Sequence, residues 1–213
     1  MSALRVAVID YGMGNVWSVI SALKYLGAEP KLVCDPKEIL SYDFIVLPGV
    51  GSFKKGMEAL KSRGIDKTIC EAVNNKGAKI LGICLGMQLL GSCGTEGGEI
   101  NGLGLVNNVV DRFTDEELSE NKIPHVGFNP VKFSDDTGLF RDLPENADFY
   151  FTHSYRMLAE NINGGHALCK YGINFLAAFE VNNICGTQFH PEKSQTNGLI
   201  LLRNFLGEAK LTC

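Results

Sequence analysis

The 213-residue sequence predicts an α/β protein whose parallel sheet carries helices on both faces, with antiparallel strands added in the C-terminal half. Three observations predict this class. Apolar runs alternate with amphipathic segments through the first half, which is the rhythm of β-α-β units. Short apolar runs then follow one another in the second half, as expected for antiparallel strands. No linker or low-complexity run divides the chain, so we expect one domain over residues 1–213.

In the first half, the predicted strands are apolar runs bounded by turn residues: 4–9, 31–34, 43–47 and 78–83. A helix is predicted over 15–26, because its apolar residues recur on one helical face before Gly27. Ile65, Ile69 and Val73 form a second helical stripe, which ends at Gly77. Strands and helices therefore alternate as a doubly wound sheet requires.

In the second half, short strands are predicted over 105–110, 126–133, 149–153, 176–181 and 184–189. Asn182-Asn183 is a tight-turn signal, so we expect the last two strands to form an antiparallel hairpin. A helix is predicted over 199–206. The polar, acidic stretch 111–121 is typical of an exposed loop or a short helix.

Composition excludes several classes of function. The chain is 45% hydrophobic and 21% charged, as soluble globular proteins are, and its net charge of −4 gives no electrostatic footprint for nucleic acid. No apolar run is long enough to span a membrane, and we expect no signal peptide. Its 7 cysteines are scattered without a C-x-x-C pair, which favours a reducing cytoplasm over a disulfide framework or a metal site.

The segment Gly82-Ile83-Cys84-Leu85-Gly86 has the layout of a nucleophile elbow, with cysteine as the nucleophile. It joins the apolar run 78–83 to a helix-like segment. Gly82 and Gly86 would remove the Cβ atoms that crowd so sharp a turn. The helix N-terminus favours a thiolate at Cys84, and the backbone N–H of Leu85 would point at an oxyanion.

His190 and Glu192 are candidate partners of Cys84, because they follow the last apolar strand and Pro191 separates them. In extended geometry both side chains point to one side, so the carboxylate can hold the imidazole tautomer. This predicts a Cys84–His190–Glu192 triad. The alternatives are a buried hydrophobic cysteine and a solvated glutamate in a turn. His125 and His166 have structural roles by default, and His153 could line a site or cap a strand.

The turn Pro48-Gly49-Val50-Gly51 follows a buried strand and lies at the same sheet edge as Cys84. Backbone N–H groups of Gly49, Val50 and Gly51 could face an oxyanion, and an ordinary glycine turn is an equal alternative. The turn Gly12-Met13-Gly14-Asn15 lacks the third glycine of a dinucleotide fingerprint.

Residues 82–88 together with His190-Pro191-Glu192 resemble the class I (triad) glutamine amidotransferase family, and the similarity runs over essentially the whole chain. The resemblance implies a flavodoxin-like mixed sheet and a hydrolysis of L-glutamine to glutamate and ammonia that needs no cofactor or metal. It also implies that the substrate is held by residues matching the family's glutamine site: Gly86, Gln88, Glu96, His153 and Ser154.

Residues 10–15, 48–51, 124–129 and 151–155 resemble one branch of that family. Its members are glutaminase subunits that pass ammonia to a (β/α)8-barrel synthase subunit in histidine biosynthesis. The resemblance implies that Asn15 senses this partner and that Phe128 fills an apolar pocket at the interface.

Phe128 stands where the branch usually has tryptophan, and it lacks the indole N–H donor. Two other functions stay open. One is a paralogous subunit that supplies ammonia for surface-sugar biosynthesis, and the other is a non-catalytic binding or regulatory protein of the same fold.

Overall fold

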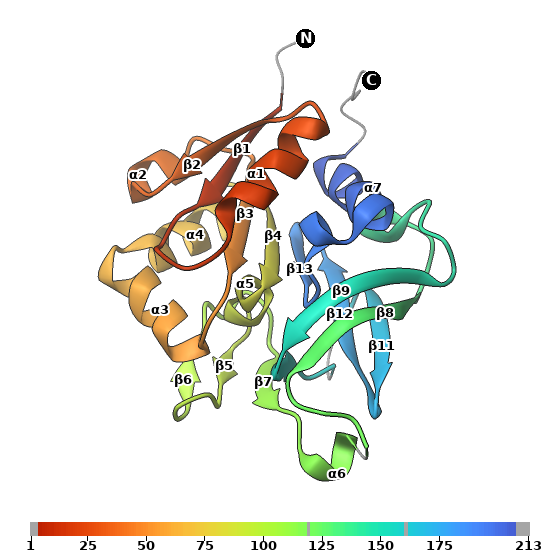
Figure 1. Ribbon diagram of the computed structural model, residues 1–213. Coiled ribbons are helices and arrows are strands. Elements are labelled where there is room, and N and C mark those ends of the chain that lie inside the picture. Colours follow the sequence, from red (N-terminus) through yellow and green to blue (C-terminus); the bar gives the residue numbers. More distant parts are fainter. Residues whose placement is uncertain (1–3, 119, 160–161, 208–213) are drawn as a thin grey trace.

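The computed structural model describes residues 4–118, 120–159 and 162–207, and its centre is a 9-stranded sheet (Figure 1). The first five strands of this sheet run parallel: β2 (Glu29–Val33), β1 (Arg5–Ile9), β3 (Phe44–Gly49), β4 (Lys79–Cys84) and β13 (Ile184–Thr187). The order β2-β1-β3-β4-β13 is the flavodoxin-like order, with β13 as the fifth strand. The predicted strands of the first half are confirmed, with ends that differ by a few residues.

Antiparallel strands extend the sheet beyond β13 in the order β12 (Ile173–Val181), β11 (Gly165–Tyr171), β8 (His125–Phe133) and β9 (Ala147–His153). The predicted hairpin is confirmed: Val181 pairs with Ile184 across a turn in which Asn182 has φ 55°. The sequence prediction missed β11.

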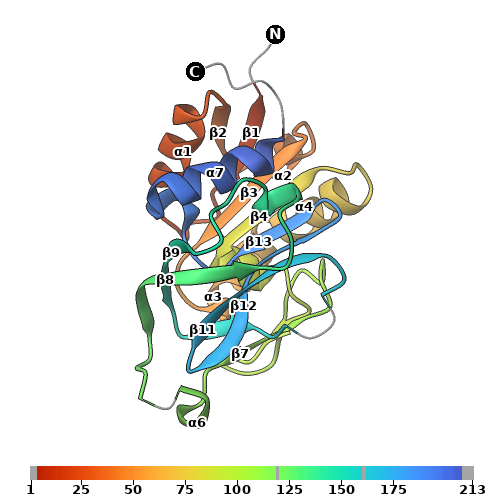
Figure 2. The same ribbon diagram turned by 90° about the vertical axis from the view of Figure 1, so that its right-hand side faces the viewer.

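Helices cover both faces of the parallel half (Figure 2). Along β1, Val6 and Val8 pack in one hydrophobic cluster while Ala7 and Ile9 pack in the other, as the alternation of a strand requires. Buried residues of α1 (Val16–Tyr25) and α7 (Gln195–Leu206) belong to the first cluster. Those of α2 (Pro36–Ile39), α3 (Phe53–Ser62) and α4 (Ile65–Asn74) belong to the second.

A second, 4-stranded sheet lies in the order β10 (Tyr155–Met157), β7 (Val109–Arg112), β5 (Cys93–Gly94) and β6 (Ile100–Asn101). The strand predicted over 105–110 was therefore placed too early. The stretch 111–121 contains the short helix α6 (Asp115–Leu118), one of the two predicted alternatives, but it is not simply exposed, because Phe113 and Leu118 are buried. Short 3-10 turns occur at η1 (Gly138–Phe140) and η2 (Pro191–Lys193).

Among the described residues, no helix has the length and apolar character that a membrane crossing requires.

Candidate active site

Cys84 occupies a strained turn between β4 and the short helix α5 (Leu85–Leu89), with φ 55° and ψ −111°. A positive φ is unusual for a residue with a side chain, and strain of this kind concentrates at functional positions. A Cβ on Gly82 would lie 2.7 Å from the backbone of Gly86, and one on Gly86 would collide with the Leu47 carbonyl oxygen of β3. Both positions therefore need glycine, as the elbow prediction requires.

His190 and Glu192 are joined by a 2.8 Å contact between His190 Nδ1 and Glu192 Oε1, and both side chains are buried. Because the carboxylate accepts, Nδ1 carries the proton and Nε2 is left to act as a base. Burial by itself lowers the pKa of His190, but the interactions with a Cys84 thiolate and with the Glu192 carboxylate outweigh it and raise this pKa to about 9, so the imidazolium is favoured once Nε2 has taken the thiol proton.

The Cys84 thiol does not yet make a hydrogen bond with the histidine. Its Sγ lies 3.8 Å from the backbone oxygen of Thr152, to which it donates, and His190 Nε2 has no partner among the described residues. Cys84 is nevertheless among the groups that raise the pKa of His190. Catalytic hydrogen bonds are often loose in structures without substrate.

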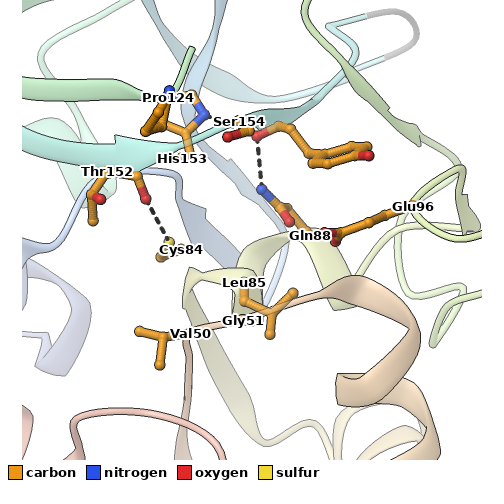
Figure 3. Close-up of a pocket in the computed structure, with 11 residues that line it drawn as sticks. Val50, Gly51, Cys84, Leu85, Gln88, Glu96, Pro124, Thr152, His153 and Ser154 are labelled. Carbon is orange, nitrogen blue, oxygen red and sulfur yellow. Dashed lines mark hydrogen bonds between the residues drawn. The ribbon is translucent and has the colours of Figure 1, made fainter.

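A pocket of about 360 Å³ opens beside Cys84 (Figure 3). It is lined by residues from both sheets, helix α5 and the intervening turns: Val50, Gly51, Cys84, Leu85, Gln88, Glu96, Pro124, Thr152, His153, Ser154 and Tyr155. The predicted glutamine-site residues Gln88, Glu96, His153 and Ser154 all lie on its wall. Gly86 does not line the pocket and instead packs against β3.

Two polar side chains of the pocket are fixed by hydrogen bonds. Glu96 Oε2 accepts from the backbone N–H of Phe53 at 2.7 Å, where α3 begins. Gln88 Nε2 donates to the Tyr155 carbonyl oxygen at 2.9 Å (Figure 3). The pocket therefore presents a carboxylate and a side-chain amide, and these groups suit a substrate with an ammonium, a carboxylate or an amide.

A relay of hydrogen bonds supports the wall that carries His153. Its Nδ1 lies 2.9 Å from the Tyr155 oxygen, its Nε2 lies 3.0 Å from His125 Nδ1, and His125 Nε2 lies 2.8 Å from Asn129 Nδ2. A carbonyl oxygen can only accept, so the directions along the relay are satisfied when both rings are neutral. Burial lowers the pKa of His125 to about 4, and burial together with His125 lowers that of His153 to about 3. Sequence patterns do not reveal this partner of His125, because the pairing of β8 with β9 creates it.

The turn 48–51 lies at the mouth of the pocket, where Val50 and Gly51 line it and Gly49 is paired with Cys84 in the sheet. It also contacts the turn 12–15: a Cβ on Gly14 would lie 3.5 Å from the backbone of Gly49, and one on Gly51 would lie 2.7 Å from Met13 Cε. The turns 12–15 and 48–51 are therefore packed together, so a movement of either turn would displace the other.

The predicted contact residues Asn15 and Phe128 are both exposed. Asn15 precedes α1 without a side-chain capping hydrogen bond, and Trp17 beside it is 68% exposed. Phe128 is 49% exposed, and its ring centroid lies 5.5 Å from that of Tyr150. Large apolar side chains left in solvent in this way mark interaction surfaces.

Within the described residues, no group of 3 or more His, Cys, Asp and Glu side chains could hold a metal ion. The described cysteines are all free thiols, and Cys34 is exposed.

Comparison with known families matches residues 7–209 to the family "Glutamine amidotransferase class-I". Among curated proteins, the chain is 43% identical to "Imidazole glycerol phosphate synthase subunit HisH 1" of Parasynechococcus marenigrum, covering 95% of this chain and 97% of that protein. It is 44% identical to the HisH subunit of Methanosarcina mazei, covering 95% of this chain and 98% of that one.

Solved structures share the fold. A putative GMP synthase subunit from Thermoplasma acidophilum superposes with a TM-score of 0.73 at 22% identity, covering 97% of this chain and 94% of that one. The glutaminase domain of Trypanosoma brucei CTPS with bound acivicin gives a TM-score of 0.65 at 13% identity, covering 95% of this chain and 94% of that one.

Proposed function

The chain belongs to the class I glutamine amidotransferase family, and we propose that it is the glutaminase subunit of an imidazole glycerol phosphate synthase. It hydrolyses L-glutamine to glutamate and ammonia and passes the ammonia to a (β/α)8-barrel synthase subunit in histidine biosynthesis. The relatives that share 43% and 44% of its residues over nearly their whole length support this assignment. We place the protein in the cytoplasm, as a single amidotransferase domain over residues 1–213.

The observation that carries the proposal is the geometry around Cys84. A cysteine in a strained turn borders a pocket of about 360 Å³, and a buried His190–Glu192 pair lies behind it. The pocket has the size of a small-molecule site and not that of a peptide groove. Gln88 and Glu96 are aimed into it, so a free amino acid with a side-chain amide is the substrate class that fits.

The reaction follows from these groups. His190 Nε2 takes the proton of the Cys84 thiol, and the thiolate attacks the substrate carboxamide carbon to form a C–S bond and an oxyanion. Backbone N–H groups of Leu85 and of the turn Gly49-Val50-Gly51 stabilise that oxyanion. His190 returns the proton to the leaving nitrogen, the C–N bond breaks, and ammonia departs. Water then attacks the thioester with His190 as base, the C–S bond breaks, His190 returns the proton to the Cys84 sulfur, and glutamate leaves.

Three features support a barrel partner. Trp17 and Phe128 leave large apolar side chains exposed to solvent. A cation lies near Phe128, because Lys193 Nζ is 5.7 Å from the centroid of the Tyr150 ring that Phe128 contacts. Asn15 lies directly after the turn that packs against residues 48–51. A partner that contacts Asn15 can thereby favour one state of the oxyanion turn over another, which couples the two sites.

The experiment is glutamine hydrolysis by the chain alone and with a barrel synthase partner plus its nucleotide ligand. We expect weak activity alone and a strong rise in the complex. Cys84→Ala should abolish glutamine-dependent synthesis and leave ammonia-dependent synthesis intact, whereas Cys34→Ala, at an exposed thiol, should change neither. Equal turnover with and without the partner would refute the coupling.

Two further observations separate the alternatives. Histidine auxotrophy of a deletion strain supports the histidine pathway, whereas loss of a surface sugar with normal growth on minimal medium supports the paralogous subunit. A Cys84 that acivicin cannot label, even in the presence of a partner, would indicate a non-catalytic protein.

A further inference from the structure

Gln188 lies level with the nucleophile in the sheet. Strand β13 runs parallel to β4, and Thr187 pairs with Ile83. The residue that follows Thr187 is therefore brought beside Cys84, the residue that follows Ile83. The Gln188 side chain is completely buried.

Two hydrogen bonds fix the Gln188 amide. Its Oε1 accepts from Gln88 Nε2 at 2.9 Å, and its Nε2 lies 3.8 Å from Cys84 Sγ as a donor. The orientation of the Gln188 amide follows from the other hydrogen bond of its neighbour Gln88. Gln88 Nε2 also donates to the carbonyl oxygen of Tyr155, which can only accept, so the Gln88 nitrogen and not its oxygen must face Gln188. Gln188 consequently turns its oxygen to Gln88 and its N–H group to the sulfur.

The bond to sulfur has a consequence for the charge state of Cys84. A neutral thiol is a weak acceptor, whereas a thiolate is a charged one, and hydrogen bonds to charged groups are roughly twice as strong as neutral ones. A donor fixed at the sulfur therefore favours the thiolate over the thiol. A buried amide is costly unless its hydrogen bonds are good, and the Gln188 amide is held by Gln88 on one side and by the sulfur of Cys84 on the other.

We propose that Gln188 is a further catalytic residue, whose side-chain N–H stabilises the thiolate of Cys84, and this role rests on the glutaminase function proposed above. In the structure the thiol donates to Thr152 O and accepts from Gln188 Nε2. When the S–H bond breaks and the proton binds His190 Nε2, the Thr152 oxygen no longer has a donor. Gln188 keeps its bond to the sulfur before and after the transfer, so it holds the nucleophile while the charge forms.

Two variants separate the donor from the acceptor. Gln188→Glu keeps an oxygen for Gln88 but presents a second oxygen to Cys84, so we expect kcat for glutamine to fall at least tenfold with KM nearly unchanged. Gln188→Met removes both bonds, so KM should rise as well. Thr187→Val is the matched control, since the Thr187 hydroxyl is buried and has no hydrogen-bond partner in the described part of the chain.

The decisive readout is the pH dependence of Cys84 alkylation by iodoacetamide, followed by mass spectrometry of the peptide that contains Cys84. Both Gln188 variants should move the midpoint upward by about one pH unit, a tenfold change in the thiol–thiolate equilibrium. Thr187→Val should leave it in place. Folded Gln188 variants with the wild-type midpoint would overturn the proposal. The readout needs neither glutamine nor a partner, so it stands even if the glutaminase function fails.

A measurement on the unaltered chain covers the case in which neither variant folds. The side-chain amide resonance of ¹⁵N-labelled Gln188 should titrate with the same midpoint as Cys84 alkylation. A Gln188 resonance whose chemical shift does not change while Cys84 titrates would overturn the proposal.

Discussion

Acid should destabilise this protein through two of its buried histidines, His125 and His153. In the folded chain the pKa of His125 is about 4 and that of His153 about 3, both below the ordinary value of 6.5. Between those values and 6.5 the unfolded chain binds more protons than the folded one. The free energy of unfolding therefore falls as the pH drops through this window, by at most about 1.4 kcal/mol per pH unit for each ring.

His125→Phe tests this by removing one of the two sites. The new ring keeps the stacking that His125 makes on Tyr171, with centroids 3.9 Å apart, and on Phe151, at 4.7 Å. It cannot donate to His153 Nε2, so a buried acceptor is left unpaired, and we expect a loss of about 1–3 kcal/mol at pH 7. The dependence of stability on pH below 6.5 should become about half as steep, because one proton is no longer taken up.

The assay is urea unfolding at half-unit steps between pH 4.5 and 7. The wild-type and His125→Phe curves should converge toward the acid end. His166→Gln is the control, because His166 lies outside the relay and its Nδ1 lies 3.3 Å from the Gly164 oxygen. A slope that is unchanged in His125→Phe, or equally reduced in His166→Gln, would refute the reasoning.

Three other perturbations have defined outcomes. Gly86→Ala drives a methyl group into the β3 backbone and should lower glutamine turnover at least a hundredfold by displacing the elbow, whereas Gly56→Ala, which meets the flexible side chains of Leu89 at 3.1 Å and Leu85 at 3.4 Å, should cost less than tenfold. Phe128→Ser should weaken binding of the barrel subunit, measured by titration calorimetry, with unchanged alkylation of the nucleophile. Glu192→Gln should lower the pKa of His190 from about 9, so the free energy of unfolding should fall less steeply as the pH rises from 6.5 to 9, as measured by thermal unfolding. A pH dependence in this range that equals that of the wild type would contradict the pairing of His190 with Glu192.

The sequence predicted the parts of the fold that rest on local patterns. Strand β4 and the elbow after it were recognisable because an apolar run ends in glycines at fixed offsets from Cys84. Helix α3 was missed because Lys54, Lys55 and Lys61 dilute its apolar stripe, although Phe53, Met57 and Leu60 are buried at helical spacing. Strand β11 was missed because its buried residues are few and it is placed by its partners on both sides.

The residues of the candidate site also divide into those that could be predicted from the sequence and those that only the pairing of strands brings together. The triad residues were predicted from motifs, and Gln88 and Glu96 from the family resemblance. The structure places Cys84, Gln88 and Glu96 around one cavity and joins His190 to Glu192 by a 2.8 Å contact. The role of the relay was beyond prediction, because His125 meets His153 only through the pairing of β8 and β9. A single sequence contains no signal for such a register.

The sheet register also explains why one cysteine among several is placed to react. Gly49 on β3 pairs with Cys84, and Gln188 follows the residue of β13 that pairs beside it. The proposed oxyanion turn, the proposed nucleophile and an amide donor are thus brought together at the carboxyl edge of the sheet, from segments far apart in the chain. Cys185, on β13 itself, has no such surroundings: burial raises its pKa, so the thiolate is disfavoured there. The reactivity that we propose for Cys84 therefore rests on its position at the end of a central strand, where strained backbone and polar neighbours meet, and not on the thiol alone.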